Sequence, residues 1–188
     1  MPSIPFYTEI NQLFEAKKFE QRTDIPEFII YKFRDMPQDK GLKMALYRKN
    51  FFQISLITQG HCASVSIDNQ YRSTLSQTIY FLSPDHVFAW ERSPQTEGYI
   101  VYFKENFLNF YGGSFILDFY FFHLADRNII SLSDEETAQI VQEFEKLYQE
   151  FHTEFKSCNH YCSRYFLSLE VCTKSKRKHL YPKVDTRN

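Results

Sequence analysis

Signatures of the common nucleophilic and nucleotide-dependent enzymes are missing from the chain. It contains no G-x-S-x-G elbow, no P-loop and no dinucleotide-binding fingerprint. The six histidines are scattered along the sequence, and we expect each of them to be a surface residue or a hydrogen-bonded polar residue. The sequence therefore predicts no catalytic residue and no enzymatic activity.

An excess of positive charge and long apolar runs are also lacking. The 22 Lys and Arg residues face 23 Asp and Glu residues, which gives a formal net charge of -1. Modules that bind DNA by themselves usually have a clear positive balance. The first residues show no basic start followed by an apolar run, and no apolar stretch approaches the roughly 20 residues that span a bilayer. We therefore expect a soluble, cytoplasmic protein with no membrane partner.

Cysteine is scarce, with four residues in the chain. Cys158 and Cys162 have His160 between them, but structural zinc usually needs four ligands and no second pair occurs at a useful spacing. We expect free, reduced cysteines and no metal or other cofactor.

Aromatic residues are abundant, with 20 Phe and 13 Tyr. From residue 27 to residue 104, short runs rich in β-branched and aromatic residues alternate with turn-like or polar segments. The runs are EFIIYKF, KMALYRK, FFQISLITQG, CASVSID, YRST, TIYFLS, VFAWERS and GYIVYFK. Many short strands at close spacing predict a β-sandwich or barrel.

The remaining segments have helical or irregular patterns. Ser133 and Glu136 form a capping box, and apolar residues then recur at the three-and-four spacing of an amphipathic helix. A second helix is expected over residues 159–174, and a short one over residues 104–113. The first 25 or so residues read as an irregular polar arm with a short helix around residues 9–20.

Four of these segments resemble the N-terminal sensing domain of AraC-family transcriptional regulators, which has a cupin-like barrel. They are FFQISLITQG, TIYFLSPDHVFAWE, EGYIVYFKENFL and ISLSDEETAQIVQEFEKLYQEF. The resemblance covers roughly residues 25 to 175 and implies a mainly β fold, a cupin-like (double-stranded β-helix) barrel followed by an antiparallel pair of α-helices. It divides the chain into an arm (1–25), an effector-binding barrel (26–130), a helical dimerisation hairpin (131–175) and a linker (176–188).

Members of this family normally continue into a DNA-binding half with two helix-turn-helix units, and the chain stops about where that half is expected to begin. Contact with DNA is therefore expected only through a C-terminal domain that is absent from this chain. The basic run KSKRK is read as a solubilising helix end rather than as a nucleic-acid patch.

Cupin barrels often bind a metal, and the resemblance locates the slots of its ligands. The two first histidine slots hold Tyr47 and Lys49, the carboxylate slot holds Gln53, and the last histidine slot holds Phe88. None of these carries its usual ligand, because an ammonium repels cations and an amide binds metals poorly. His86 lies two residues from the last slot and would share its face of a strand.

An aromatic cavity with a few polar groups is the alternative to a metal site. Alternation places Tyr47, Lys49 and Gln53 with the group His86, Phe88 and Trp90 inside the barrel. We predict these six residues as a site for a small molecule. A barrel of this size is also filled readily by its own side chains, so a packed core stays open as an alternative. For Lys49, the alternative to a position in the site is a solvent-exposed charge at the end of its strand.

The helical hairpin is predicted to form a homodimer. Leu147, Phe151 and Phe155 lie on its apolar face, and each either packs on its own barrel or contacts a second subunit. The leading functional hypothesis is a non-catalytic, dimeric sensing domain whose unknown small-molecule effector is a sugar or another metabolite. A metal-dependent cupin enzyme (an isomerase or dioxygenase) and a solid barrel that only dimerises are the competing hypotheses.

Overall fold

The computed structural model describes residues 3–61, 63–108, 122 and 128–153. Its strands are β1 (Phe6–Tyr7), β2 (Phe28–Lys32), β3 (Lys43–Lys49), β4 (Phe52–Gln59), β5 (Ser64–Ile67), β6 (Gln70–Ser73), β7 (Thr78–Leu82), β8 (Phe88–Glu91), β9 (Glu97–Phe103) and β10 (Ile129–Ser131). Its helices are α1 (Ile10–Ala16), α3 (Asp134–Thr153) and the short 3-10 turns η1 (Phe33–Asp35) and η2 (Glu105–Leu108). No helix in these ranges is long and apolar enough to cross a membrane.

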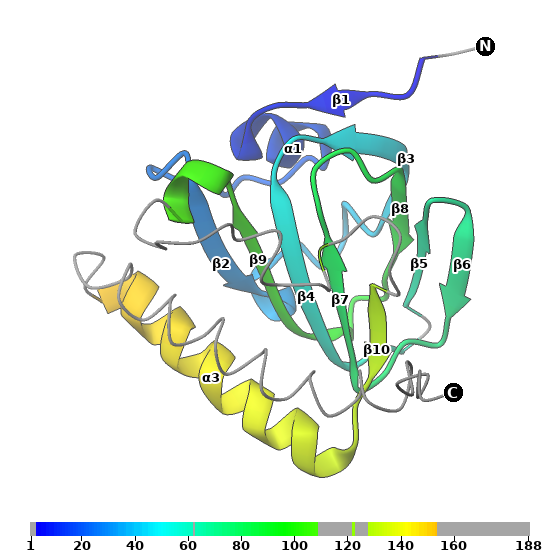
Figure 1. Ribbon diagram of the computed structural model, residues 1–188, viewed down its shortest axis with the longest axis vertical. Helices are drawn as coiled ribbons and strands as arrows, with labels where there is room; N and C mark the ends of the chain where they lie inside the picture. The colour runs from blue at the N-terminus through cyan, green and yellow to red at the C-terminus, as the bar shows by residue number, and fades with distance from the viewer. Residues whose placement is uncertain (1–2, 62, 109–121, 123–127, 154–188) are drawn as a thin grey trace, which may run out of the picture. The chain divides into compact units, whose positions relative to one another are not determined.

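The strands form two five-stranded sheets, with the orders β1-β3-β8-β5-β6 and β10-β7-β4-β9-β2 (Figure 1). Pairing is nested, because β5 pairs with β6, β4 with β7, β3 with β8 and β2 with β9, all antiparallel. This is the pattern of a long hairpin folded over on itself, the jelly-roll or double-stranded β-helix arrangement of cupins. The expected class, mainly β with a cupin-like barrel and a C-terminal helix, is confirmed.

The eight strands predicted from runs of β-branched and aromatic residues are all present. The bounds of β3 coincide with the run KMALYRK, and those of β4 lie within FFQISLITQG. Strands β1 and β10 were not predicted. They have two and three residues, too few for an alternating pattern to be recognised.

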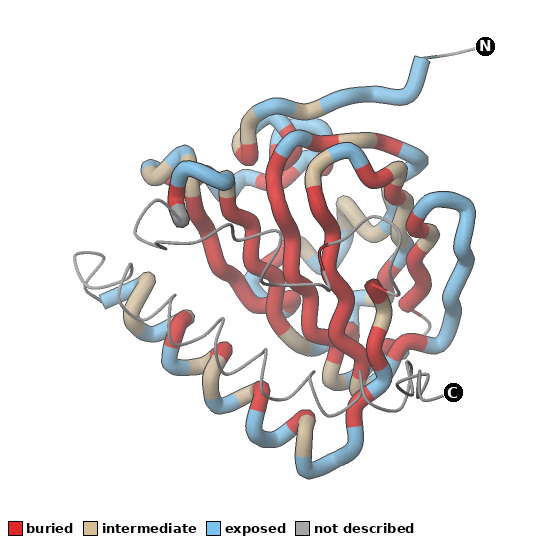
Figure 2. Tube along the Cα trace, in the orientation of Figure 1, coloured by how far each residue is buried: buried red, intermediate tan, exposed pale blue. Residues whose placement is uncertain are grey.

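The central strands are buried on both faces, whereas the edge strand β6 is exposed throughout (Figure 2). Residues that pair across strands point to the same side of a sheet. Gln53 pairs with Tyr102 and Ser55 pairs with Tyr80, and since Gln53 and Ser55 are two residues apart on β4, all four share one face. We call it the inner face, and it includes Gln53, Ser55, Ile57, Tyr80, Ile100 and Tyr102. The outer face consists of Phe52, Ile54, Leu56, Ile79, Phe81, Val101 and Phe103.

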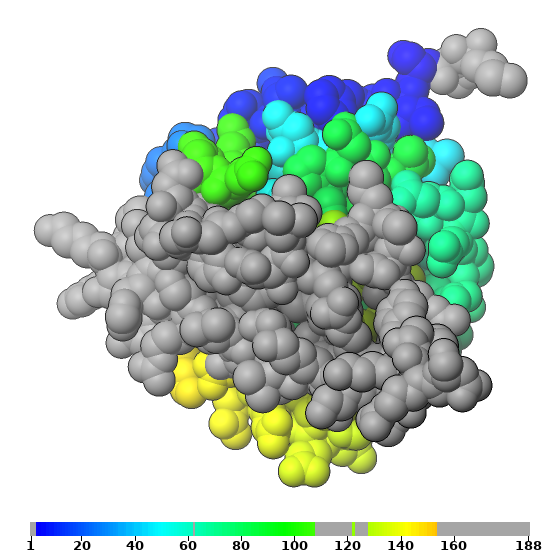
Figure 3. Space-filling view, in the orientation of Figure 1, coloured from blue at the N-terminus to red at the C-terminus, as the bar shows by residue number. Residues whose placement is uncertain are grey.

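The N-terminal segment is more ordered than the irregular arm expected from its composition. Strand β1 pairs in parallel with β3 (Figure 1), and α1 buries Ile10, Leu13 and Phe14. In the space-filling view the dark-blue N-terminal segment lies against the cyan and green atoms of later strands (Figure 3). An ion pair of 2.6 Å joins Glu9 to Lys104, and Asn11 exchanges two hydrogen bonds with Thr23. This segment therefore belongs to the packed structure and contributes residues to its interior.

The chain divides into two compact units, residues 1–137 and 138–188, and all described strands belong to the first. Helix α3 begins with the expected capping box, in which the Ser133 amide donates to Glu136 and the Glu136 amide donates to the Ser133 hydroxyl. Leu147 is buried and Phe151 is half-buried. Phe155, the four cysteines, the second helix expected at 159–174 and the linker at 176–188 lie outside the described residues.

Candidate functional site

A cavity lies between the two sheets of the first unit. Gln53, Tyr80 and Tyr102 line it from the inner face of one sheet, and Phe88 and Trp90 line it from the other. Lys17 and Arg92, which are not in strands, complete a polar part of the wall. The cavity has a volume of about 20 Å³, which is room for about one water molecule. As folded here, the interior is thus nearly filled by its own side chains.

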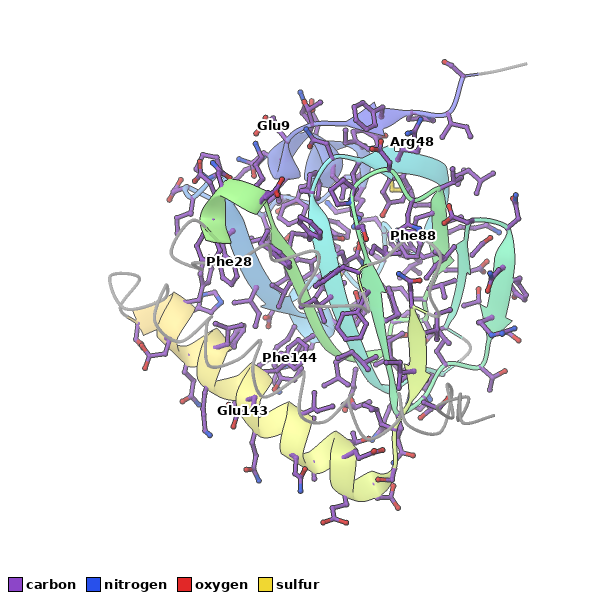
Figure 4. All side chains as sticks on the ribbon, viewed as in Figure 1. Glu9, Phe28, Arg48, Phe88, Glu143 and Phe144 are labelled. Atoms are coloured by element: carbon purple, nitrogen blue, oxygen red, sulfur yellow. The ribbon has the colours of Figure 1, made fainter. Side chains whose placement is uncertain are left out.

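Three of the six predicted ligand-binding residues line this cavity. Gln53, Phe88 and Trp90 do so, and Figure 4 shows Phe88 among the side chains of the barrel interior. Tyr47 packs edge-on against Phe88 with ring centroids 5.7 Å apart, so it supports the wall from behind. Alternation is confirmed on β3, because Tyr47 and Lys49 are buried whereas Arg48 lies at the periphery and pairs with Asp85.

His86 is buried but does not line the cavity. Its Nδ1 lies 2.5 Å from a carboxylate oxygen of Asp68, and its Nε2 lies 3.3 Å from the side-chain amide of Asn128. Since the amide donates to Nε2, the proton is on Nδ1 and is donated to Asp68. Burial lowers the pKa of His86, which favours this neutral form, although Asp68 acts in the opposite direction. These contacts tie the β5–β6 turn to the segment before β10.

Lys49 is 2% exposed, so its side chain is not the solvated strand end considered above. Its Nζ lies 5.6 Å from the centroid of the Phe51 ring, and it forms no hydrogen bond with any described residue. Burial lowers the pKa of Lys49 to about 7, which leaves the amine divided between its charged and neutral forms at neutral pH.

Lys17 enters the site from the end of α1 and was not predicted. Its Nζ donates to the hydroxyl of Tyr102 at 2.7 Å and lies 5.2 Å from the centroid of the Trp90 ring. Burial lowers the pKa of Lys17 well below its usual value, and the positive charges of Lys49 and Arg92 lower it further. No local pattern reveals this role, because 85 residues separate Lys17 from Tyr102.

Arg92 was also missed, although the alternation that groups His86, Phe88 and Trp90 extends to it. It is 4% exposed and donates from one terminal nitrogen to the carbonyl of Pro37 at 2.6 Å. Its Nε has no hydrogen-bond partner among the described residues, and the same holds for Nε1 of Trp90 and Oε1 of Gln53.

The tyrosines of the wall are neutral hydrogen-bonding groups. Burial raises the pKa of Tyr80 to about 12, and it raises the pKa values of Tyr47 and Tyr102 well above the ordinary value. Within the described ranges, no three His, Cys, Asp or Glu side chains come together as a metal-binding group. The cavity therefore offers aromatic walls, neutral phenols and buried cationic groups.

Comparison with known proteins gives structural likenesses only. No protein-family profile matches the chain, and no curated protein matches it. An apo structure of ToxT from Vibrio cholerae strain SCE256 is 11% identical with a TM-score of 0.45, covering 89% of this chain and 61% of that one. The AraC-like transcriptional activator CuxR is 11% identical with a TM-score of 0.43, covering 87% of this chain and 60% of that one.

A cupin protein from Bacteroides fragilis is 13% identical with a TM-score of 0.30, covering 55% of this chain and 96% of that one. The chain spans about three fifths of the length of the ToxT and CuxR structures.

Proposed function

We propose that this chain is the effector-sensing and dimerisation part of an AraC-type transcriptional regulator. A small molecule binds between the two sheets, and its binding is passed to a DNA-binding domain that is not part of this chain. The proposed role is regulatory and non-catalytic, and it is exercised in the cytoplasm by a homodimer. Phe151 and Phe155 are the proposed contacts between subunits, whereas Leu147 is 2% exposed in the single chain and is left out of the proposed interface.

The observation that carries this proposal is the group of unsatisfied polar atoms around the cavity. Buried polar atoms in folded proteins nearly always have a hydrogen-bond partner, because an unpaired one costs about 1–3 kcal/mol. Here Trp90, Gln53 and Arg92 each bury an atom without a partner in the described structure, and all three line one cavity. Unused hydrogen-bonding capacity at one place is what a ligand site offers.

Transmission of the signal is proposed to begin at Lys17. The cavity holds about one water molecule, so a larger ligand has to displace a side chain from its wall. Lys17 is the wall residue contributed by the N-terminal segment, next to α1. A ligand that competes for Tyr102 or Trp90 therefore changes how that segment is held, and it shifts the equilibrium between two arrangements of the segment.

A barrel that only dimerises is the second candidate, and the small volume of the cavity favours it. In that case the interior is a packed core, and no small molecule changes the stability of the protein. The two candidates differ in whether a small molecule raises the unfolding temperature of the purified chain.

The test is a thermal-unfolding screen against sugars, nucleotides, other metabolites and divalent metals, with a chelator control. A ligand at about 100 times its dissociation constant adds roughly 2.7 kcal/mol, which for a chain of this size raises the midpoint by roughly 5 to 10 °C. The sensing domain predicts an organic ligand with this effect and a change in the fluorescence of Trp90, the single tryptophan. A large fall in the midpoint with chelator would point to a metal enzyme instead, and no response to any compound would favour the solid barrel.

A further inference from the structure

Basic side chains are concentrated inside the barrel. Lys17, Lys49 and Arg92 are 4%, 2% and 4% exposed, and their side chains come from three separate parts of the chain. Lys17 and Arg92 line the cavity itself, and Lys49 follows Tyr47 on the same face of β3. Burying a cation is costly unless an opposite charge accompanies it.

Negative charge that would balance these cations is missing from the described interior. No Asp or Glu side chain is buried in the described ranges. Glu91 borders the cavity, but its carboxylate pairs with Lys43 at 3.1 Å and its side chain is 53% exposed. Asp68 is 43% exposed in its side chain and pairs with His86. Neither carboxylate neutralises Lys17, Lys49 or Arg92.

The hydrogen-bonding groups around the cavity also favour a partner that is rich in acceptors. Nε1 of Trp90, which faces the hydroxyl of Tyr47, and Nε of Arg92 are buried donors that make no hydrogen bond in the described structure. Nζ of Lys49 donates no hydrogen bond to a described residue either. Oε1 of Gln53 lines the cavity as an acceptor without a partner, and the hydroxyls of Tyr31 and Tyr47, which both donate and accept, also lack partners in the described structure. A group that brings several acceptor oxygens and a negative charge satisfies these donors and cations at once.

The rest of the wall is aromatic or aliphatic. Phe33, Met36, Phe88 and Ile100 line the cavity together with the rings of Trp90 and the tyrosines. Such walls suit a hydrocarbon or aromatic body attached to the charged group.

We infer that the ligand of this cavity is a small organic anion, whose acid group binds among Lys17, Arg92 and Trp90 while Lys49 adds positive charge from β3. This inference rests on the proposed sensing function and specifies the chemical class of the effector. In the absence of the anion, Lys17 is held by Tyr102. Binding of the acid group replaces that contact with a stronger, charge-assisted one.

The experiment compares carboxylic acids with their own amides, which share the body and lack the charge. The pairs are butyrate and butyramide, hexanoate and hexanamide, benzoate and benzamide, and phenylacetate and phenylacetamide, all at equal ionic strength. Thermal unfolding and isothermal calorimetry are measured on the wild-type chain and on Lys17→Met and Lys49→Met. Lys43→Met is the matched control, because Lys43 lies on the same strand as Lys49 with a side chain that is 73% exposed.

The expected result is that at least one acid binds at least tenfold more tightly than its amide. Both Lys17→Met and Lys49→Met should lose about tenfold or more of this affinity, whereas Lys43→Met should keep it. The variants keep the shape of an unbranched side chain and remove a buried charge, and folding is checked by circular dichroism.

Two results would overturn the inference in distinguishable ways. If amides or neutral sugars bind as well as the acids, and neither lysine variant changes the affinity, the cavity senses neutral molecules and only the anion assignment is wrong. If no acid, amide or other compound of the effector screen binds, the sensing function fails together with it.

Discussion

Phe52, Ile54 and Leu56 lie on one face of β4, Gln53, Ser55 and Ile57 lie on the other, and all six are buried. On the outer face, Phe52 and Phe103 stack with centroids 5.0 Å apart, and Phe122 packs edge-on against both. On the inner face, the side-chain amide of Gln53 donates a hydrogen bond to the hydroxyl of Ser55, and the hydroxyl of Tyr102 accepts one from Nζ of Lys17. One strand thus separates a hydrocarbon core from a polar interior.

This difference assigns separate tasks to the two faces. The outer face removes apolar surface from water, which is the main source of stability. The inner face instead borders an interior that buries the basic groups of Lys17, Lys49 and Arg92 and donors without partners in the described structure, which oppose stability. Proteins retain such groups where function requires them, so substitutions on the two faces should change stability in opposite directions.

The largest expected effect is on the outer face. Phe103 is 0% exposed and contacts Phe52 and Phe122, so Phe103→Ala removes a full aromatic side chain from the hydrocarbon core. We expect the free energy of unfolding to fall by about 3–5 kcal/mol, measured by urea denaturation. A loss below about 1 kcal/mol would mean that this face is not a close-packed core.

The second prediction concerns Lys49 on the inner side of the barrel. Lys49→Met removes a buried charge that has no carboxylate partner and leaves a flexible apolar side chain of similar length. We expect the free energy of unfolding to rise by about 1–3 kcal/mol. Lys43→Met, the exposed control on β3, should stay within about 0.5 kcal/mol of the wild type.

The third prediction is that stability depends on pH through the buried lysines. The pKa of Lys49 is about 7 in the folded chain, below its ordinary value of 10.5, so between these values the unfolded chain binds more protons. Stability should therefore rise with pH in this window, by at most about 1.4 kcal/mol per pH unit for one group. Lys17, whose pKa is also lowered, acts in the same direction.

Urea denaturation at pH 6.5 and 9.5 measures this effect. The advantage of Lys49→Met over the wild type should be largest at pH 6.5 and should shrink at pH 9.5. An advantage that is the same at both pH values would show that the charge of Lys49 does not oppose folding.

The smallest effect is expected at Gln53, next to the core residues Phe52 and Ile54. Gln53→Leu removes a hydrogen bond of 2.9 Å to Ser55 and also an acceptor without a partner, so the two contributions nearly cancel. We expect stability within about 1 kcal/mol of the wild type and a weaker response to any ligand that binds the cavity. A large loss of stability would place Gln53 in the core rather than at a binding surface.

The division between the two faces follows from alternation along β4, and the eight predicted strands follow from runs rich in β-branched and aromatic residues. Alternation also places Tyr47, Lys49, Phe88 and Trp90 on the sides where the structure has them. The register of β4 against β7 and β9 was not predictable, and that register is what brings Tyr80 and Tyr102 beside Ser55 and Gln53. Pairing depends on contacts between distant segments, which a local pattern does not contain.

The buried position of Lys17 could not be predicted from the sequence. Its neighbours Ala16 and Lys18 give it the appearance of an exposed residue at a helix end, and only tertiary packing carries it to Tyr102. Arg92 was within reach, because it continues the alternating series of His86, Phe88 and Trp90. His86 was predicted as a ligand-binding residue, with a surface or hydrogen-bonded position as the alternative. It does not line the cavity, and its hydrogen-bond partners Asp68 and Asn128 come from other turns.

Stability and affinity measured on the same variant decide whether the interior of the barrel is built for a ligand. Wild-type protein and Lys49→Met are each unfolded in urea and titrated in a calorimeter with the acid that binds the wild type most tightly. We expect the variant to be more stable than the wild type and to bind the acid at least tenfold more weakly. A variant that is less stable than the wild type, or that binds the acid equally well, would show that the buried lysine is not retained for a ligand at the expense of stability.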